Sequence, residues 1–389
     1  MGGAWAQTPP SKGDGKVGNP YIITKAEELE WFRDQVNSGQ YSICAKIADN
    51  VEVIDMSTVC HAADKFQNLE EKSWVPIGNR DIIKYRGTFD GNGKTITNLY
   101  INASQTSQNN MGLFGYTYQS TIKNLTFENA NVTNTQSNTG ILVGKAGYGS
   151  TLQNIKISNT CQIKGGNNTG GIAGYLVGNA YNCVNCAMVQ GIQYIGGLCG
   201  FYSISRTGNS MTACANYGNV TASSLGVGGL VGYFDSGTIQ DCANYGGVKG
   251  TDYIAGMAGS VNKGKIQNVF NYGNISATNS TDAGMAFGNS TNGTTEGMVA
   301  YYSGAKLNAN GQEITVKAFG NGKPSEDNAT GFTEAQLRSG EVAWLLNGST
   351  STPAEGNTLA WYQKLGENGD AYPVLKSTGD NTVYGGYQH

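Results

Sequence analysis

The tetrapeptide Gly229-Leu230-Val231-Gly232 decides the fold, because versions of it recur at a nearly constant interval. The copies end at residues 115, 144, 174, 200, 232, 259 and 288, so the steps are 29, 30, 26, 32, 27 and 29 residues. A period in this range is typical of a solenoid, in which each repeat forms one coil and only stacking buries its apolar face. We therefore expect a stack of about seven to eight coils.

A short apolar-x-polar-apolar pattern follows each glycine box and indicates the kind of coil. Its copies are Ile96–Leu99, Ile122–Leu125, Leu152–Ile155, Met211–Cys214, Ile239–Cys242 and Ile266–Val269. A third apolar position precedes the next box, at Val132, Ile163, Val189, Val220, Val248 and Ile275. Short segments of this kind, separated by Gly, Asn, Ser and Thr, are typical of strands. Three per coil predict an all-β fold, a right-handed parallel β-helix with coils ~4.8 Å apart.

Glycine and asparagine have expected roles in such a coil. Glycine suits a corner with positive φ or a backbone that lies flush against the next coil, and asparagine is the next best residue at a corner. One asparagine recurs at an equivalent position in four successive coils, which predicts a ladder of side-chain amide hydrogen bonds. Its members are Asn185, Asn216, Asn244 and Asn271.

Composition limits the function classes. Glycine accounts for 57 of the 389 residues, roughly twice its ordinary usage of about 7%. Charged residues make up only 14% and the net charge is -3, which argues against a strongly basic protein that binds nucleic acid or a membrane surface. No apolar run approaches the ~20 residues of a transmembrane helix, so we expect no membrane insertion.

The glycine boxes resemble the GLUG motif, named for its Gly-Leu-x-Gly core, which occurs in repeat regions of bacterial surface and secreted proteins. The stretches Asn19–Ile23 and Tyr85–Ile96 look like the lead-in that accompanies such repeats, and Tyr372–Leu375 looks like a tail seen in gut Bacteroidetes proteins. The resemblance implies an extracytoplasmic protein, secreted or attached to the outer membrane or cell surface. It is specific for architecture rather than activity, because the enzyme members of the family, IgA-cleaving metalloproteases, carry their chemistry outside the repeats.

Caps are expected at both ends of the solenoid. A helix over Thr24–Asn37 begins with a capping box of Thr24 and Glu27, and a second capping box pairs Thr333 with Gln336. Such caps cover strand edges and prevent end-to-end association. The expected division is 1–15 disordered leader, 16–87 N-terminal cap, 88–308 β-helix and 309–389 C-terminal cap.

The eight cysteines fit core positions better than a disulfide framework. Three of them take the inward strand position that other coils fill with Leu or Val: Cys183, Cys214 and Cys242. The Cys183-x-x-Cys186 spacing has no second pair of the kind that a zinc site needs, so no metal is expected. Cys44 and Cys60 both lie in the N-terminal cap, where the sequence leaves a disulfide open.

Catalytic patterns are sparse. The only histidines are His61 and His389, which exclude a His-based triad or a His-x-x-x-His metal site. Polysaccharide-cutting β-helix enzymes need clustered carboxylates, whereas the acids here do not repeat at one strand position. Asp235 and Asp252 flank one coil, with Arg206 on the preceding loop, and form the one weak candidate cluster. No cofactor is implied.

Tyr217, Tyr245 and Tyr272 follow the ladder asparagines in three consecutive coils, each within Asn-Tyr-Gly. They should stack as a strip beside a corner. An aromatic strip on a weakly charged face is what a sugar-binding surface uses, and these are the candidate ligand-binding residues. The alternative is that the stacked rings only stabilise the corner.

We therefore expect a non-catalytic, monomeric β-helix that acts as an adhesin or as a scaffold binding a host surface glycan, a host protein or a polysaccharide. Nucleic acid is not an expected partner. The alternative is a carbohydrate-active β-helix enzyme, a polysaccharide lyase or glycoside hydrolase, which a groove holding two carboxylates within ~10 Å would favour.

Overall fold

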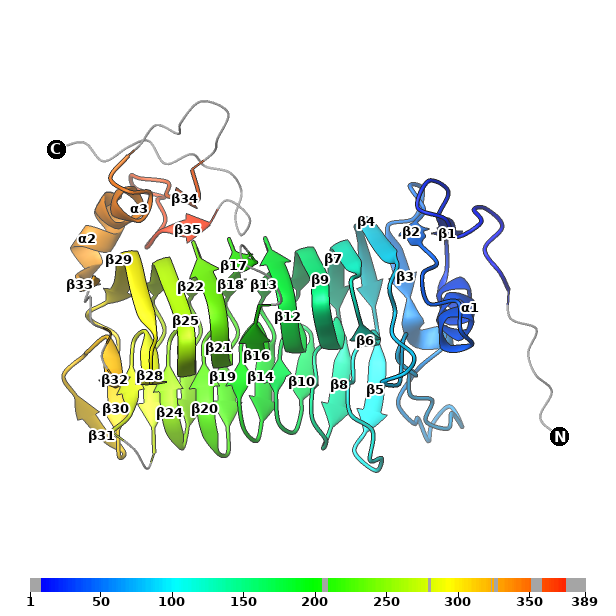
Figure 1. The fold of residues 1–389 in the computed structure, drawn as a ribbon, viewed down its shortest axis with the longest axis horizontal. Helices are drawn as coiled ribbons and strands as arrows, with labels where there is room; N and C mark the ends of the chain where they lie inside the picture. The colour runs from blue at the N-terminus through cyan, green and yellow to red at the C-terminus, as the bar shows by residue number, and fades with distance from the viewer. Residues whose placement is uncertain are drawn as a thin grey trace.

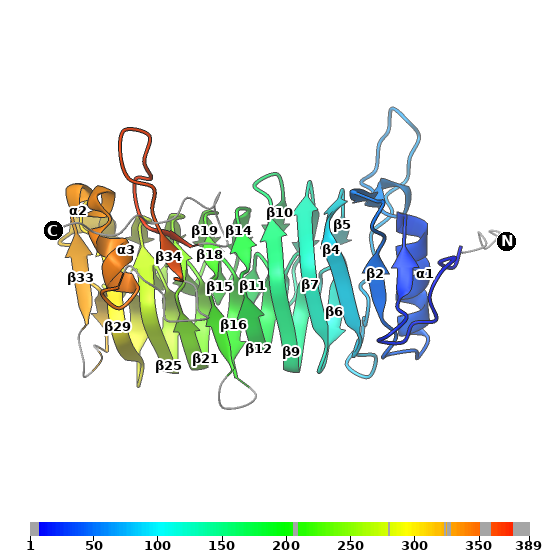
Figure 2. The same cartoon turned by 90° about the horizontal axis from the view of Figure 1, so that it is seen from above.

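The computed structural model describes residues 8–204, 209–278, 281–322, 324, 328–350 and 359–375. It is a right-handed parallel β-helix of about 8 turns, as the period predicts. Figures 1 and 2 show an elongated stack of coils with one helix packed at its N-terminal end. Within these described ranges the strands form three sheets along the stack, of 19, 9 and 5 strands, and a separate pair lies near the C-terminus.

The elements have the following bounds. The 19-stranded sheet contains β1 (Tyr21–Ile23), β2 (Ala45–Ile47), β3 (Val53–Asp55), β4 (Thr88–Thr97), β6 (Phe114–Thr117), β7 (Thr121–Glu128), β9 (Val143–Ile157), β12 (Ala173–Tyr181), β13 (Val184–Asn185), β16 (Cys199–Ser203), β17 (Ser210–Thr212), β18 (Ala215–Asn216), β21 (Val231–Gln240), β22 (Ala243–Asn244), β25 (Ala258–Asn271), β28 (Phe287–Ser290), β29 (Thr294–Tyr302), β32 (Phe319–Asn321) and β33 (Ala329–Phe332). The 9-stranded sheet contains β5 (Tyr100–Ala103), β8 (Asn131–Asn134), β10 (Gln162–Lys164), β14 (Met188–Gly191), β19 (Val220–Ala222), β23 (Val248–Gly250), β26 (Ile275–Ala277), β30 (Leu307–Ala309) and β31 (Gln312–Ile314). The 5-stranded sheet contains β11 (Thr169–Gly170), β15 (Ile195–Gly196), β20 (Leu225–Gly228), β24 (Asp252–Ala255) and β27 (Ala283–Gly284), and the pair is β34 (Trp361–Tyr362) with β35 (Val374–Leu375). The helices are α1 (Ala26–Asn37), the 3-10 turn η1 (Met56–Thr58), α2 (Glu334–Ser339) and α3 (Glu341–Leu346).

Successive coils pair in register at the predicted apolar positions. Val231 pairs with Ala258, and Ile239 pairs with Ile266. The third position behaves in the same way, since Val248 pairs with Ile275. The short strands of the 5-stranded sheet, which lie directly before or at the start of the last five boxes, are the part of the coil that the sequence pattern did not indicate.

The box glycines are required by close packing. None of them has positive φ. A Cβ added to Gly229 would lie 2.2 Å from both Asn244 Cγ and the carbonyl oxygen of Gly256, and one added to Gly232 would lie 2.3 Å from the backbone of Tyr194. The first glycine therefore packs against the asparagine ladder and the next coil, and the second packs against the preceding coil.

The asparagine ladder is confirmed. Its four side chains are at most 1% exposed, and the side-chain amide of Asn216 donates to Oδ1 of Asn244 at 2.9 Å. Two further asparagine columns, at residues 124, 154 and 182 and at residues 110, 138 and 168, occupy corners with φ between 51° and 64°. These columns are also hydrogen-bonded, as from Asn138 to Asn110 at 2.8 Å. Positive φ thus belongs to the corner columns, not to the boxes or the buried ladder.

The aligned cysteines lie in the core as small hydrophobic residues, as predicted. Cys183, Cys214 and Cys242 are at most 1% exposed, and the backbone N–H of Cys183 donates to Sγ of Cys214 at 3.4 Å. All eight cysteines lie in the described residues and are free. The disulfide that the sequence left open between Cys44 and Cys60 is therefore not formed.

The N-terminal region departs from the expected boundaries. Helix α1 begins at Ala26, and Glu28 rather than Glu27 accepts hydrogen bonds from the backbone N–H and hydroxyl of Thr24, at 2.6 and 2.9 Å. Parallel pairing already runs from β1 to β2 to β4, so coils begin before residue 88. Part of the expected leader is also ordered, since Lys12 accepts a backbone hydrogen bond from Ile22.

One strand register was assigned wrongly from the sequence. The pattern placed Ile96 with Ile122, but Ile96 pairs with Phe127, and Phe89 is the residue that pairs with Ile122. The register shifts between Asp90 and Lys94, where Gly91 packs against the backbone of the next coil. Between these two pairs β4 has more residues than β7, and these extra residues displaced the alignment of Ile96 made from the sequence pattern.

The C-terminal region both extends and flanks the solenoid. Strands β32 and β33 continue the parallel pairing beyond residue 308. The predicted capping box of Thr333 and Gln336 begins α2. Helices α2 and α3 and the β34–β35 pair then lie along one side of the coils rather than across their end (Figure 1). There a second apolar cluster joins Phe270 and Phe332 of the coils to Trp361.

Candidate functional site

The tyrosine strip of the sequence analysis forms a stack, and the C-terminal segment lies on it. The rings of Tyr217 and Tyr245 are stacked with centroids 4.5 Å apart. Tyr372 packs against Tyr245 at 4.8 Å and against Tyr272 at 4.7 Å. The hydroxyl of Tyr245 donates to the carbonyl of Pro373 at 2.7 Å. The segment covers part of the strip, but all three tyrosines remain partly exposed, and their sugar-binding role stays a prediction.

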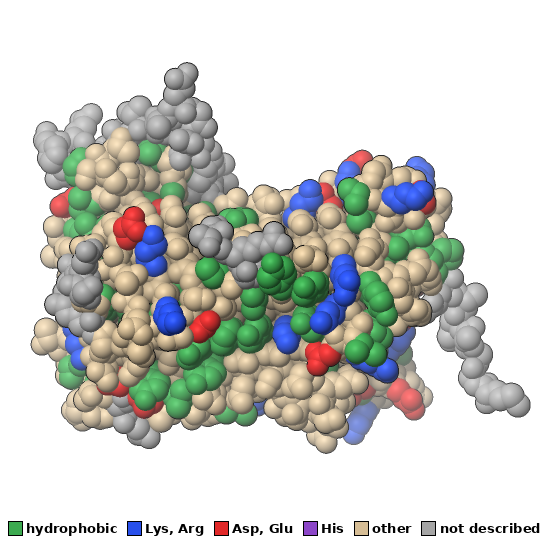
Figure 3. Space-filling view, in the orientation of Figure 1, with side chains coloured by type: hydrophobic (Ala, Val, Ile, Leu, Met, Phe, Trp, Pro, Cys, Tyr) green, Lys and Arg blue, Asp and Glu red, His purple; other side chains and the backbone are tan. Residues whose placement is uncertain are grey.

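A second row of aromatic side chains lies on the outer side of another face. Strand register places five residues in one line across β6, β9, β12, β16 and β21, and we call this row the aromatic ladder. Its members are Tyr116, Lys145, Tyr175, Phe201 and Tyr233. Four of the five are partly exposed, and Tyr116 is 9% exposed. Figure 3 shows hydrophobic side chains gathered in a band across this face, with Lys and Arg side chains beside its N-terminal half.

The rings of the ladder stack face to face. Tyr175 and Phe201 have centroids 4.2 Å apart and planes 2° apart, and Phe201 and Tyr233 have centroids 5.3 Å apart. Stacked rings of this kind present their edges outward, and ring edges carry partial positive charge. The ladder is therefore an apolar ridge with a weakly positive outer margin.

Two cations lie over ladder rings in the N-terminal half, and a third lies over the nearby ring of Tyr118, which is not a ladder member. The Lys145 ammonium is 4.7 Å from the centroid of Tyr116 and 5.5 Å from that of Tyr175. Lys84 also lies 4.7 Å from Tyr116, and Arg86 lies 5.4 Å from Tyr118. Within the described part of the chain, none of these three cations forms an ion pair with a carboxylate.

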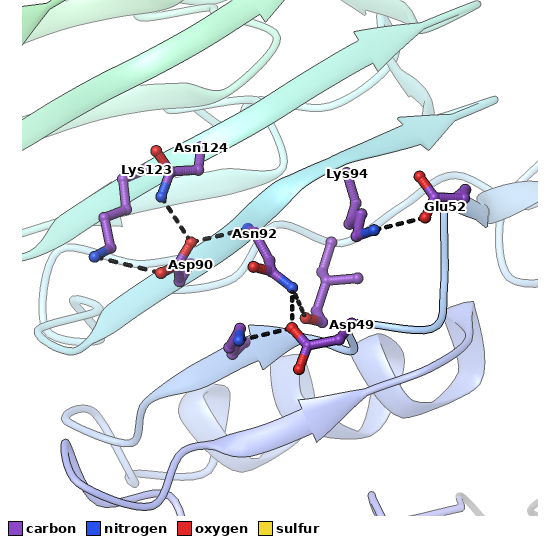
Figure 4. A network of polar contacts seen from close by, with 9 residues as sticks. Asp49, Glu52, Asp90, Asn92, Lys94, Lys123 and Asn124 are labelled. Carbon is purple, nitrogen blue, oxygen red and sulfur yellow. Dashed lines mark hydrogen bonds and ion pairs between the residues drawn. The ribbon is translucent and has the colours of Figure 1, made fainter.

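Lysines near the N-terminal end, on the neighbouring face, are paired. Figure 4 shows Lys94 bonded to Glu52 at 2.7 Å and Lys123 paired with Asp90 at 3.3 Å. Asp90 also accepts hydrogen bonds from the side chain of Asn124 at 3.0 Å and from the backbone of Asn92 at 2.8 Å. Burial raises the pKa of Asp90, but these hydrogen bonds and Lys123 outweigh burial, so its pKa lies below the ordinary value.

A carboxylate lies toward the other end of the ladder. Asp235 accepts hydrogen bonds from the hydroxyl of Ser203 and from the side-chain amide of Asn262, both at 3.0 Å. Burial, followed by the charge of Asp235, raises the pKa of Tyr175 and of Tyr233. The ladder thus runs from a cationic end near β6 to an acidic end near β21.

A shallow groove of about 460 Å³ crosses the 9-stranded sheet. Its lining includes Thr133, Lys164, Gln190, Ile192 and Ser223, and none of the lining residues is a carboxylate. A glycosidase-type site needs two carboxyl groups in its groove. The lining of this groove therefore lacks the carboxyl pair of a glycosidase-type site.

The two carboxylates of the weak catalytic cluster lie on different sheets, Asp235 on β21 of the 19-stranded sheet and Asp252 on β24 of the 5-stranded sheet. Asp252 accepts a hydrogen bond from the backbone of its neighbour Tyr253, whereas Asp235 is held by the groups given above. Arg206 lies outside the described residues. In the ranges that the structure describes, no three His, Cys, Asp or Glu side chains are grouped so that they could hold a metal ion.

The sequence did contain a signal for the aromatic ladder. Each ladder residue directly follows the last glycine of a box, as Tyr175 follows Gly174 and Phe201 follows Gly200. This position lies on the outer face because side chains alternate along a strand and the residue that follows it, such as Leu176, Tyr202 or Phe234, is buried in the core. In the next two coils the same position holds Ser260 and Asn289, so the aromatic row ends there.

Comparison with known proteins supports the fold. No protein-family model matches the chain, so the GLUG resemblance stays a prediction. A solved Bacteroides ovatus structure, described as that of a proposed immunoglobulin A1 protease, is similar with a TM-score of 0.55 and 18% identity over 95% of this chain and 96% of that one. Halomucin of Haloquadratum walsbyi is 30% identical over 236 residues, or 58% of this chain. The chain spans only 2% of the length of Halomucin.

Among the residues that the structure describes, no helix is both long and apolar enough to cross a membrane.

Proposed function

We propose that this protein is a non-catalytic β-helix, secreted or attached to a cell surface, that binds a polysaccharide or the glycans of a host surface. The observation that carries the proposal is the aromatic ladder, which crosses four adjacent coil-to-coil steps on a flat outer face. Its ridge of ring edges and tyrosine hydroxyls offers apolar contact and hydrogen bonds along the same line, as sugar recognition requires. The likeness to a Bacteroides ovatus structure and the partial match to Halomucin accord with an extracytoplasmic location.

Binding to immobilised polysaccharides tests the proposal. Phe201→Ala removes the central ring of the ladder, and we expect it to weaken binding by about fivefold, because it removes an apolar ring-edge contact worth roughly 1 kcal/mol from the middle of the ridge. Phe66→Ala is the matched control, since Phe66 is fully exposed in a loop away from the ladder. Equal effects of the two substitutions would refute the ladder as the binding surface. We further expect the protein to be a monomer, which size-exclusion chromatography checks.

The enzymatic alternatives need a separate measurement. The neighbour named as a proposed protease shares 18% identity with this chain, a level at which the likeness concerns the fold alone. We expect neither immunoglobulin A1 nor the bound polysaccharides to be cut during long incubation with the purified chain. Appearance of protein fragments or of new reducing or unsaturated sugar ends would refute a purely binding role.

A further inference from the structure

The charges of the aromatic ladder specify the ligand further. Resting on the function proposed above, we propose that the ligand is an anionic polysaccharide, whose sugar units carry carboxylate or sulfate groups. Its acidic groups lie over Lys84, Arg86 and Lys145 at the N-terminal half of the ladder, and its neutral portion extends toward Tyr233.

The pairing of the cations supports this assignment. The chain has a net charge of -3, and Arg33, a cation that lies over the ring of Trp74 elsewhere in the structure, is paired with Glu30 and Asp34. Lys84, Arg86 and Lys145 also lie over aromatic rings, but they form no ion pair among the described residues. An anionic ligand would supply the missing charge.

The position of Lys145 supports it independently. Lys145 occupies a rung of the ladder itself, between Tyr116 and Tyr175, and the rings hold its ammonium on the line that a bound chain would follow. A cation held in this way loses less side-chain freedom when it binds an anion than a free surface lysine does. The outward ring edges add partial positive charge along the same line.

The acidic end of the ladder favours a polysaccharide over a nucleic acid. A nucleic acid carries a phosphate at every nucleotide, so a strand following the ladder would bring phosphate close to the carboxylate of Asp235. A polysaccharide can place a neutral unit there, and its hydroxyls can donate to that carboxylate. Asp235 thus sets the direction in which a partly charged chain lies.

Polygalacturonate and its fully methyl-esterified form are suitable probes, because they share one backbone and differ in charge. We expect the full chain to bind polygalacturonate at least about tenfold more tightly at low salt, and the difference to shrink as salt rises. Lys145→Gln should weaken binding of polygalacturonate about fivefold and binding of the ester by less than about twofold, because the ester loses only uncharged contact with this rung. Lys249→Gln, which removes an exposed charge from the 9-stranded sheet, is the control and should change neither.

The outcomes separate the two proposals. Equal binding of the acid and the ester, with both weakened by Phe201→Ala, would overturn the anionic ligand and leave the proposed function standing. Equal losses from Lys145→Gln and Lys249→Gln would also overturn it, since the charge effect would then be non-specific. Tighter binding of oligo(dT) than of polygalacturonate would overturn it in favour of a nucleic acid. Binding of no polysaccharide at all would refute both proposals.

Discussion

Replacing Asn216 by alanine should be among the most damaging single changes in the solenoid. The side chain is fully buried, and its amide donates to the carbonyl of Gly218 at 2.8 Å and to Oδ1 of Asn244 at 2.9 Å. Its own Oδ1 accepts from the amide of Asn185 at 2.9 Å. The substitution removes one partner from each of three buried polar groups. At about 1–3 kcal/mol for each such group, partly offset by relaxation, we expect a loss of roughly 3–5 kcal/mol.

Asn154→Gly is the matched control. Asn154 belongs to a corner column with comparable amide hydrogen bonds, at 2.7 and 3.1 Å, but it is exposed, so water replaces what is lost. Its φ of 54° suits glycine, and we expect a loss below about 1 kcal/mol. Urea unfolding followed by circular dichroism measures both variants, and hydrogen exchange in β18 and β22 tests whether the loss is local. Equal losses of unfolding free energy in the two variants would refute burial as the reason why the asparagine ladder stabilises the protein.

Three further outcomes follow from the structure. Gly229→Ala should prevent formation of soluble folded protein, because its Cβ would lie 2.2 Å from backbone oxygen, whereas Gly18→Ala, with open space around it, should fold normally by circular dichroism. Asp90→Asn should be less stable than the wild type at pH 7, and this difference in stability should shrink below about pH 4. The reason is that the folded protein lowers the pKa of Asp90, so the stabilisation by its carboxylate is lost as that group is protonated. A difference in urea midpoint that stays constant with pH would contradict this. Cys214 should resist alkylation by iodoacetamide in the native protein and react on unfolding, because it is fully buried and burial raises the pKa of its thiol. Mass spectrometry of labelled peptides measures this alkylation.

The coil architecture was predictable because it depends on local constraints that repeat. A Cβ at Gly229 or Gly232 would clash with a neighbouring coil, so glycine is needed at these positions in each coil. The spacing between the boxes therefore gives the number of residues in one turn. The inward strand positions also recur once per coil with apolar residues, and this recurrence is why Cys183 could be predicted to lie in the core. The register error at Ile96 arose where extra residues broke the repeat.

The candidate site was harder to predict because exposure depends on distant segments. Tyr245 was predicted to be an outward ring beside a corner, whereas Tyr175 was not singled out from the sequence. Pro373, whose carbonyl accepts the hydroxyl of Tyr245, is 128 residues away in sequence, and nothing in the repeat shows where that segment docks. Tyr175 is not part of this contact, yet it follows a box glycine and could have been found by comparing the residues at that position across coils.

The packing of the boxes on both neighbours limits how such a protein can change in length. Because Gly229 contacts the coil that follows and Gly232 the coil that precedes, removal of part of a repeat would misalign every contact beyond it. Gain or loss of an entire turn leaves each remaining interface intact. Natural variants should therefore differ in size by whole turns, and a duplicated turn with an aromatic residue after its box would lengthen the binding line by one sugar-sized step.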